Sequence, residues 1–497
     1  MPYDDVVTAP AAESSTHFRL TDGVVLGFAA ELVLLPTGLI TAAVLTRTLG
    51  PGGYGLFSVA ATFITWLAAS TTTLLARAAV KFVSEADEWR PVATGVLRWR
   101  LGIGAAASLV VLVAASPIAR VLGAPPLAPY LAVFAVDLLL SNLARAHRDV
   151  LTGRGRFREV AAVSAARWLS RLVLIVALVR ATGSVMGAVV GSVGATLVEL
   201  LVARWRVPIS PRGHSTVSRS MLWSVAAPLM LYGVALQLYS KIDLFALSAL
   251  GHSSADAGLY AAAQNLAVIP GLFAMAISPL LLATLSRLRR IDAEYQARRV
   301  GRIALRASIC LVPLAAIVAG AAPEIVRRIF GASFAASGAL LALLFAGGVA
   351  LAIMSVAVSI ITAIDEQRIV SLLGLAVLVA AIAGHLTLIP RFGAVGAATV
   401  TLLCGAAGAV ASLALVHRMW GVHAYATMAR AAAIAVPAYW IAAHLAGVGL
   451  LVLMFSLAVM SIGVVVAFVL LGELDADERR RWRSAWPIGR AAAAESE

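Results

Sequence analysis

Long apolar segments dominate the chain and alternate with short polar or charged loops. Each segment has about 20 residues, the length that an α-helix needs to cross the hydrocarbon core of a bilayer. The pattern therefore predicts an all-α polytopic membrane protein with about fourteen spans. They are residues 23–46, 55–76, 99–119, 128–148, 159–180, 184–204, 221–249, 258–284, 303–322, 335–361, 369–389, 394–416, 428–447 and 449–471.

Composition supports this fold class. Over 497 residues, 61% are hydrophobic and 13% are charged, and the mean hydropathy is +0.93. These values exclude an ordinary soluble protein. Cys310 and Cys404 both lie in apolar segments, without the spacing of a metal site or a disulfide framework, so we interpret them as packing residues. We expect no metal and no cofactor.

Basic residues give the orientation of the chain. If the N-terminus is cytoplasmic, thirty Lys and Arg residues fall on the inner side and six on the outer side, and Arg167, Arg171 and Lys241 lie within helices. Such an excess in short inner loops follows the positive-inside rule. We therefore expect both termini in the cytoplasm, in a bacterial-type cytoplasmic membrane. The net charge of +14 needs no nucleic-acid partner to explain it.

A hairpin between Lys241 and Arg290 has a weaker copy between Arg47 and Ala60. Both contain LG, a turn, and then G-L-aromatic before a second apolar segment. Three glycine landmarks recur in the same order in each half, which indicates a duplication. Each half contains six helices that start from the cytoplasm, so the repeats are parallel in topology. The landmarks are Gly55, Gly123 and Gly187 in the first half, and Gly258, Gly331 and Gly396 in the second.

The repeat divides the chain into two lobes with additions at the ends. We expect two helices to follow the second lobe. The predicted parts are a cytoplasmic tail at 1–20, an N-lobe at 21–204, a cytoplasmic linker at 205–220, a C-lobe at 221–416, helices 13 and 14 at 425–471, and a basic cytoplasmic tail at 472–497.

The loops exclude several functions. The predicted outer loops are too short for a lumenal domain, and the first one, TRTLGPGGYG, carries no acid. No GxxxxGK[ST] motif is present, so the chain does not itself use ATP in the manner of a P-loop transporter. We interpret TGRGRF, at 152–157, as a turn anchored at the inner leaflet. The remaining possibilities are gradient-driven or facilitated transport, not enzymatic catalysis.

Five motifs stand in register with the predicted helices. They are RTLGPGGYGLFSVA after helix 1, DLFALSALG with AGLYAAAQNLAVIP across helices 7 and 8, LTGRGRFREV after helix 4, VRRIFGASF after helix 9, and PRFGAVGAA entering helix 12. Over about residues 20–420, the chain resembles the polysaccharide biosynthesis or O-antigen flippases of the multidrug/oligosaccharidyl-lipid/polysaccharide (MOP) superfamily.

The resemblance implies two six-helix lobes around a cavity that opens alternately to each side of the membrane. It also implies a polyprenyl-pyrophosphate-linked oligosaccharide as cargo, moved from the inner to the outer leaflet for export of a cell-surface polysaccharide. The expected partners are this lipid-linked glycan, membrane lipids, a coupling ion such as H⁺ or Na⁺, and polysaccharide assembly enzymes.

The cations within helices are the candidate substrate-binding residues. Arg167 and Arg171 are spaced i,i+4, so they share one face of helix 5 near mid-membrane. An arginine at that depth is costly unless it faces a polar interior. The alternative is that both side chains snorkel to the inner headgroups. Lys241 is a third candidate, with snorkelling to the outer headgroups as its alternative.

The candidate coupling or ion-pair acids are Glu31, Asp137 and Asp243. Glu31 precedes Pro36, which can free a backbone carbonyl in helix 1. A proton or cation site and a structural ion pair with Arg167 or Arg171 are both open for Glu31 and Asp137, and we favour the structural role for Asp137. Glu199 lies close to the end of helix 6, where we expect an interfacial position.

Other functions remain as alternatives to a lipid-linked oligosaccharide flippase. They are a MATE-like drug or cation antiporter, a lipid II flippase, and a membrane glycan polymerase or ligase. Cations within helices suit an anionic phosphate head group better than a cationic drug. A catalytic cluster of acids at the outer face would favour the polymerase.

Overall fold

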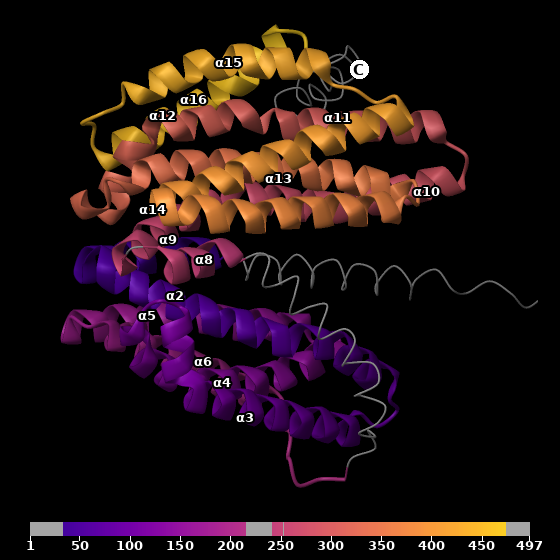
Figure 1. Ribbon diagram of the computed structural model, residues 1–497. Helices are drawn as coiled ribbons and strands as arrows, with labels where there is room; N and C mark the ends of the chain where they lie inside the picture. The colour runs from indigo at the N-terminus through magenta and orange to yellow at the C-terminus, as the bar shows by residue number, and fades with distance from the viewer. Residues whose placement is uncertain (1–32, 215–240, 252, 474–497) are drawn as a thin grey trace, which may run out of the picture. The chain divides into compact units, whose positions relative to one another are not determined.

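The computed structural model describes residues 33–214, 241–251 and 253–473, and all regular structure in those ranges is helical (Figure 1). The predicted tail at 1–20, most of the seventh span and the residues after 473 lie outside the described residues. Long apolar segments form helices because no water is available in a bilayer to satisfy open backbone groups.

The described α-helices fall into two groups in chain order. The first group is α2 (Leu34–Glu85), α3 (Trp89–Val121), α4 (Ala128–Gly153), α5 (Phe157–Thr182), α6 (Val185–Arg206), α8 (Ile242–Leu250) and α9 (Ser254–Ala267). The second is α10 (Ile269–Arg290), α11 (Glu294–Ile309), α12 (Leu311–Phe330), α13 (Ser337–Ala363), α14 (Gln367–Trp420), α15 (Tyr425–Ala443) and α16 (Leu450–Leu470). Short 3₁₀ turns occupy Pro125–Leu127 and Ala332–Phe334.

Two of these helices each contain two predicted spans. Gly50 breaks α2 with φ 67°, and Gly393 breaks α14 with φ 55°. A positive φ is readily adopted only by glycine, so each break falls where the sequence supplies one. Eleven helices in the described ranges are long and apolar enough to cross a membrane. They account for every predicted span except the seventh.

Several helices extend past their predicted spans. Helix α3 begins at Trp89, ten residues before the predicted span, and α4 continues to Gly153. The helical backbone continues where the apolar segment has ended, because hydropathy marks the bilayer core and not the helix end. As a result Asp149 belongs to α4, and Arg100 and Arg148, which lie at the ends of their predicted spans, are several residues inside α3 and α4.

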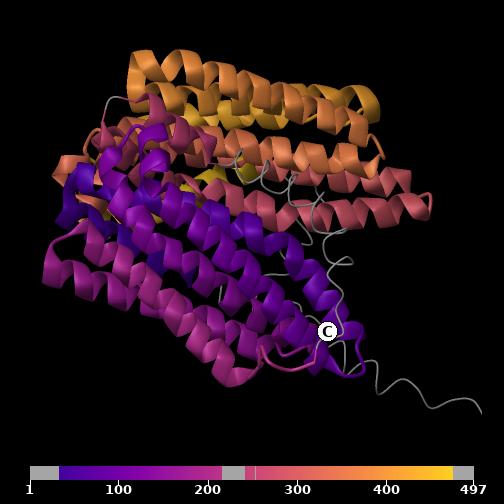
Figure 2. The ribbon, with the colours of Figure 1, turned by 60° about the horizontal axis from the view of Figure 1, so that its bottom comes forward.

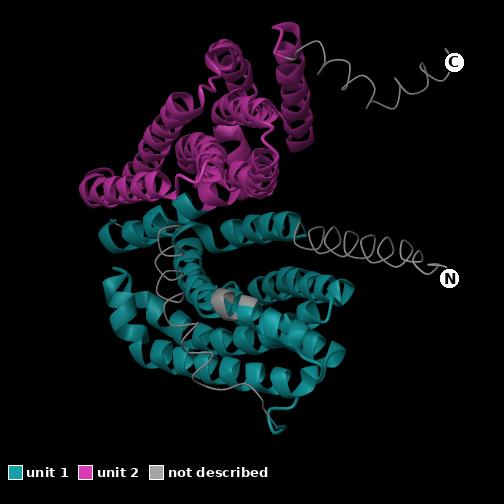
Figure 3. Ribbon diagram, turned by 90° about the vertical axis from the view of Figure 1, so that its right-hand side faces the viewer, with its two compact units in different colours: residues 1–261 teal, residues 262–497 magenta. Residues whose placement is uncertain are grey.

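The chain divides into two compact units, residues 1–261 and 262–497 (Figure 3). The division falls within α9, so α8 and the first part of α9 belong to unit 1. Ser248 Oγ of α8 donates a hydrogen bond to the carbonyl of Leu122 at 2.7 Å, and the Phe245 ring packs against Phe63 and Trp66 of α2. The predicted lobe limits were derived from the order of the sequence repeat. A division into compact units does not test that order, so the lobe limits stay a prediction.

Two landmark glycines of the repeat face each other within unit 1. A Cβ on Gly55 would lie 1.8 Å from the carbonyl oxygen of Ser254, and a Cβ on Gly258 would lie 2.0 Å from that of Pro51. Each glycine thus meets the residue four positions before the other one. This reciprocal contact is the pattern of an isologous interface, which equivalent segments of a duplicated chain can form.

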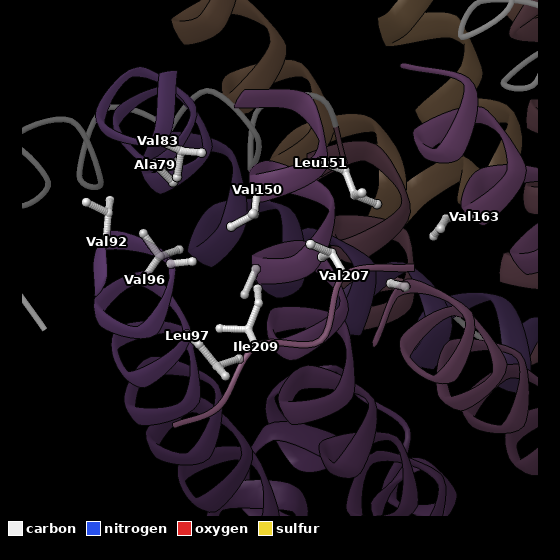
Figure 4. Close-up of a cluster of buried hydrophobic side chains, with 13 residues drawn as sticks. Ala79, Val83, Val92, Val96, Leu97, Val150, Leu151, Val163, Val207 and Ile209 are labelled. Carbon is white, nitrogen blue, oxygen red and sulfur yellow. The ribbon is translucent and has the colours of Figure 1, made fainter. Parts of the chain in front are cut away.

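Helices α3 to α6 lie side by side in unit 1 (Figures 1 and 2). A buried apolar cluster at one end includes Val207 and Ile209, which follow α6 and lie near α3 and α4 (Figure 4). Arg98 of α3 donates hydrogen bonds to the carbonyls of Pro211 and Gly213 at 2.6 and 2.7 Å. The start of the predicted linker therefore packs on unit 1.

Helix α13 is central in unit 2, where it packs against α10, α12 and α14. It is apolar on all sides and buried along most of its length, as expected for a helix surrounded by other helices. Helix α15 approaches α12 closely at Gly320, where a Cβ would lie 2.4 Å from the carbonyl oxygen of Tyr439.

Glu473, directly after α16, is buried and joins three helices of unit 2. Its carboxylate accepts hydrogen bonds from Arg306 of α11 at 2.6 Å and from Arg430 of α15 at 2.6 Å, and also from Thr427 of α15. At the opposite end of these helices, Arg328 of α12 donates to the carbonyl of Gly447, between α15 and α16, at 3.0 Å. The last two helices are thus tied to α11–α12 at both ends.

Candidate functional site

Helices α4, α5 and α6 carry ionisable side chains within unit 1. Arg156, in the α4–α5 turn, donates a hydrogen bond to the carbonyl of Arg206 at 3.2 Å, so the end of α4, the start of α5 and the end of α6 lie together. We call six side chains along these helices the charge ladder. They are Arg148, Glu199, Arg145, Arg167, Arg171 and Asp137, spread from about 8 to about 24 Å along the helices from that end, at 1.5 Å per residue.

Glu199 of α6 contacts two arginines of the ladder, Arg148 from α4 and Arg167 from α5. Its side chain is 2% exposed. Arg148 Nη1 lies 3.2 Å from Glu199 Oε1 and donates a hydrogen bond to it, and Arg167 Nη1 lies 3.0 Å from Oε2. Neighbouring helices thus cover this turn of α6 and supply the counter-ions of Glu199, while its interfacial depth in the membrane stays a prediction.

Arg167 and Arg171 share one face of α5, as predicted, with Trp168 between them. Their guanidinium carbons lie 5.2 and 5.9 Å from the centroid of the Trp168 ring, within the range of cation–π attraction. Arg171 is half-buried and interacts electrostatically with Asp137 and Tyr54. The electrostatic neighbours of Arg171 thus come from α4 and α2.

Asp137 is the ladder's deepest acid and is 9% exposed. It lies close to Thr196 of α6, and Arg167, Arg171 and Glu199 are its charged neighbours. Its Oδ1 atom has no hydrogen-bond partner among the described residues. Asp137 thus lies near Arg167 and Arg171, the two predicted cations of α5. This position agrees with a coupling role and equally with a structural role.

A second buried pair lies beside the ladder. Arg100 of α3, which is 0% exposed, forms an ion pair with Asp149 of α4 and donates a hydrogen bond to the carbonyl of Thr72 at 3.1 Å. In the described part of α3 to α6, cations outnumber acids in this interior. The arginines are Arg100, Arg145, Arg148, Arg167 and Arg171, and the acids are Asp137, Asp149 and Glu199.

Lys241 and Asp243 do not join the ladder. Lys241 immediately precedes α8 and its carbonyl accepts a hydrogen bond from the Phe245 amide, while its side chain makes neither a hydrogen bond nor an ion pair with the described residues. Asp243 accepts a hydrogen bond from the Tyr260 hydroxyl of α9 at 2.7 Å and from the Leu244 amide at 2.8 Å. Asp243 thus ties α8 to α9. Glu31 lies outside the described residues.

Sequence reasoning missed the partners of Arg167. Glu199, Arg148 and the Arg100–Asp149 pair were all assigned to interfaces or loops, or were not considered. A usable signal existed in the acids themselves, since Glu199 lies within a predicted span and Asp149 directly follows one. Arginines at a similar height on adjacent helices can reach both. The position of a residue along its helix, however, does not determine which neighbouring helix the residue faces.

The arrangement suits an anion. Guanidinium groups keep their charge and match the geometry of phosphate oxygens with paired N–H donors. Among the residues that the structure describes, no group of three or more His, Cys, Asp or Glu side chains could hold a metal ion.

Comparisons with known proteins agree with this fold. The profile of one family, described as polysaccharide biosynthesis protein, matches residues 44–339, more than half of the chain. No curated protein sequence matches. Among solved structures, the lipid II flippase MurJ in an inward closed conformation has a TM-score of 0.70 at 14% identity, with 90% of this chain and 98% of that chain covered.

Two further similar structures are multidrug resistance MATE family transporters of the MOP superfamily. An inward-facing one has a TM-score of 0.59 at 15% identity and covers 79% of this chain and 96% of its own. An outward-facing one has a TM-score of 0.54 at 17% identity and covers 84% of this chain and 95% of its own. The predicted fold class is confirmed, and at these identities the likeness concerns the fold.

Proposed function

Because this chain belongs to the polysaccharide biosynthesis protein family and is a transporter of the MOP superfamily, we propose that it is a flippase for a polyprenyl-pyrophosphate-linked oligosaccharide. It is a transporter and not an enzyme. In the proposed cycle the anionic head group leaves the inner leaflet, passes through the protein by alternating access and reaches the outer leaflet, while the polyprenyl tail stays in the bilayer.

The excess of arginines over acids inside unit 1 carries the proposal. Arginine within a membrane span is costly, and it persists where it faces a polar interior and serves a pathway. Arg167 and Arg171 are the proposed head-group ligands, and Lys241 is proposed as a further cation on the route. A pyrophosphate offers several oxygens to such donors, whereas a cationic drug would be repelled by them.

The acids have proposed roles of their own. Asp137 lies beside the proposed ligands, where proton or cation binding would change the local charge, and Glu31 and Asp243 are the other proposed coupling or ion-pair acids. H⁺ or Na⁺ is the proposed coupling ion, and polysaccharide assembly enzymes are the proposed partners.

Topology and location belong to the same proposal. Both termini are cytoplasmic in it, the membrane is a bacterial-type cytoplasmic membrane, and the lobes are residues 21–204 and 221–416. In this orientation the α4–α5 turn faces the cytoplasm, because Arg154, Arg156 and Arg158 lie at it. The charge ladder then rises from the inner leaflet, where the lipid-linked glycan is made, toward mid-membrane.

A reconstituted system tests the proposal. Purified protein is placed in vesicles that carry a polyprenyl-pyrophosphate-linked oligosaccharide, and delivery is measured by cleavage of the glycan with an impermeant glycosidase. We expect Arg167→Met combined with Arg171→Met to slow delivery by at least about tenfold, since two charge-assisted contacts are lost. The control is Arg180→Met, an exposed arginine in the last turn of α5.

Two outcomes would contradict the proposal. Delivery by the double variant at the wild-type rate would show that the ladder does not bind the head group. Delivery of lipid II, with no delivery of the lipid-linked oligosaccharide by the wild-type protein, would identify the lipid II flippase instead.

A further inference from the structure

The two arginines that contact Glu199 are held unequally. Arg148 donates an aligned hydrogen bond to Oε1, and its side chain is 12% exposed. Arg167 lies 3.0 Å from Oε2, but that oxygen accepts no hydrogen bond of good geometry among the described residues. The Arg167 side chain is also the more exposed, at 26%, and its guanidinium lies over the Trp168 ring.

This difference allows Arg167 to leave while Arg148 stays. A buried carboxylate must keep a counter-ion, and the hydrogen bond from Arg148 supplies one. Arg167 can therefore turn away without leaving Glu199 as an isolated charge. A phosphate oxygen is a better partner for Arg167, because phosphate accepts two parallel N–H bonds and the present contact uses one nitrogen in poor alignment.

Arg171 gives the arriving anion a first contact. It is one helical turn beyond Arg167 on the same face of α5, and it has no ion pair within the described residues, with Asp137 acting on it only through electrostatics. An anion attracted by Arg171 would come within reach of Arg167 and would compete with Glu199 for it.

We propose that Glu199 is an internal substitute for the anionic head group. It holds Arg167 while the site is empty, gives Arg167 up to a phosphate oxygen of the cargo, and takes it back as the cargo leaves. This inference rests on the proposed function and adds a positioning residue to it. Glu199 weakens cargo binding and speeds release, so the charged site does not become a trap for a multiply charged ligand.

The proposal predicts effects of opposite sign for the two partners of one ion pair. Glu199→Gln removes the competitor and should tighten binding by about tenfold, the effect of one charge-assisted contact. Arg148→Met leaves Glu199 with Arg167 alone, which it then holds more firmly, so binding should weaken by about tenfold. The double variant has neither the competitor nor its second partner, and it should bind as tightly as Glu199→Gln.

Trp168 provides the measurement. Undecaprenyl pyrophosphate without a sugar is titrated into the full-length protein in nanodiscs, and undecaprenol is the control ligand without phosphate. Because Arg167 and Arg171 lie over the Trp168 ring, loss of Arg167 to the ligand should change tryptophan fluorescence, and Trp168→Phe should remove the change.

The outcomes separate this inference from the proposed function. If the wild-type protein binds undecaprenyl pyrophosphate no better than undecaprenol, the proposed function fails. If the wild-type protein binds it and all three variants bind with equal or lower affinity, Glu199 is only a structural counter-ion and the inference is overturned. If Glu199→Gln alone does not fold, the double variant is compared with Arg148→Met and with the wild type. Competition by Glu199 makes the double variant bind more tightly than both, and equal or weaker binding overturns the inference.

Discussion

The contact between Gly55 and Gly258 permits a sharp test of how α2 and α9 pack. A Cβ at Gly55 would lie 1.8 Å from the Ser254 carbonyl oxygen, whereas ordinary van der Waals contact begins near 3.4 Å. Backbone atoms cannot rotate aside, so Gly55→Ala must separate the two helices by about 1.6 Å. The helices then lose the packing around this point.

The magnitude follows from two opposing terms. Overpacking costs about 1–3 kcal/mol, and replacing a helical glycine by alanine returns about 0.5–1 kcal/mol. We expect Gly55→Ala and Gly258→Ala each to lower the free energy of unfolding by about 1–2 kcal/mol. The double variant should lose less than the sum of the two, because the first Cβ has already separated the helices.

Thermal unfolding in detergent, followed by intrinsic fluorescence, measures the effect. Gly102→Ala in α3 and Gly271→Ala in α10 are matched controls, since a Cβ at either position meets nothing within 4 Å. They should leave the melting temperature unchanged or raise it. A melting temperature of Gly55→Ala at or above the wild-type value would refute the packing argument.

Three further predictions concern individual side chains. Burial alone would raise the pKa of Glu473, but hydrogen bonds from the Thr427 hydroxyl and from the guanidinium groups of Arg306 and Arg430 hold the pKa below its ordinary value. The ionised Glu473 carboxylate therefore stabilises the folded protein above its unfolded pKa of about 4.3, and this stabilisation is lost as the pH falls through the lower folded pKa. Between about pH 5 and pH 3, the melting temperature should depend on pH more steeply in the wild type than in Glu473→Gln. Arg98→Ala removes two hydrogen bonds to the segment after α6 and should speed amide hydrogen exchange there, and exchange equal to that of an Arg90→Ala control would contradict this. Tyr260→Phe removes the hydroxyl donor of Asp243 and should lower the free energy of unfolding by about 1–3 kcal/mol, whereas unchanged melting would show that water replaces the hydroxyl.

The order of the helices could be predicted from the sequence. Every described α-helix overlaps a predicted span, and the breaks at Gly50 and Gly393 fall between predicted spans. Two predicted spans, 258–284 and 303–322, are each divided between two helices. The i,i+4 pairing of Arg167 and Arg171 was equally accessible. These properties depend on the length of apolar segments, on the backbone freedom of glycine and on helical periodicity. Each of them is local in the sequence and needs no knowledge of neighbouring helices.

Lateral contacts could not be predicted in the same way. The sequence places Glu199 near the end of a helix, but only the packing of α4, α5 and α6 brings Arg148 and Arg167 to it and buries it. Likewise, the repeat identifies Gly55 and Gly258 as equivalent, while only the structure shows that they meet. A hydropathy pattern states how deep a residue lies in the membrane. Which neighbour it faces depends on the rotation of each helix and on the small residues that allow close approach, and these are set by the tertiary structure.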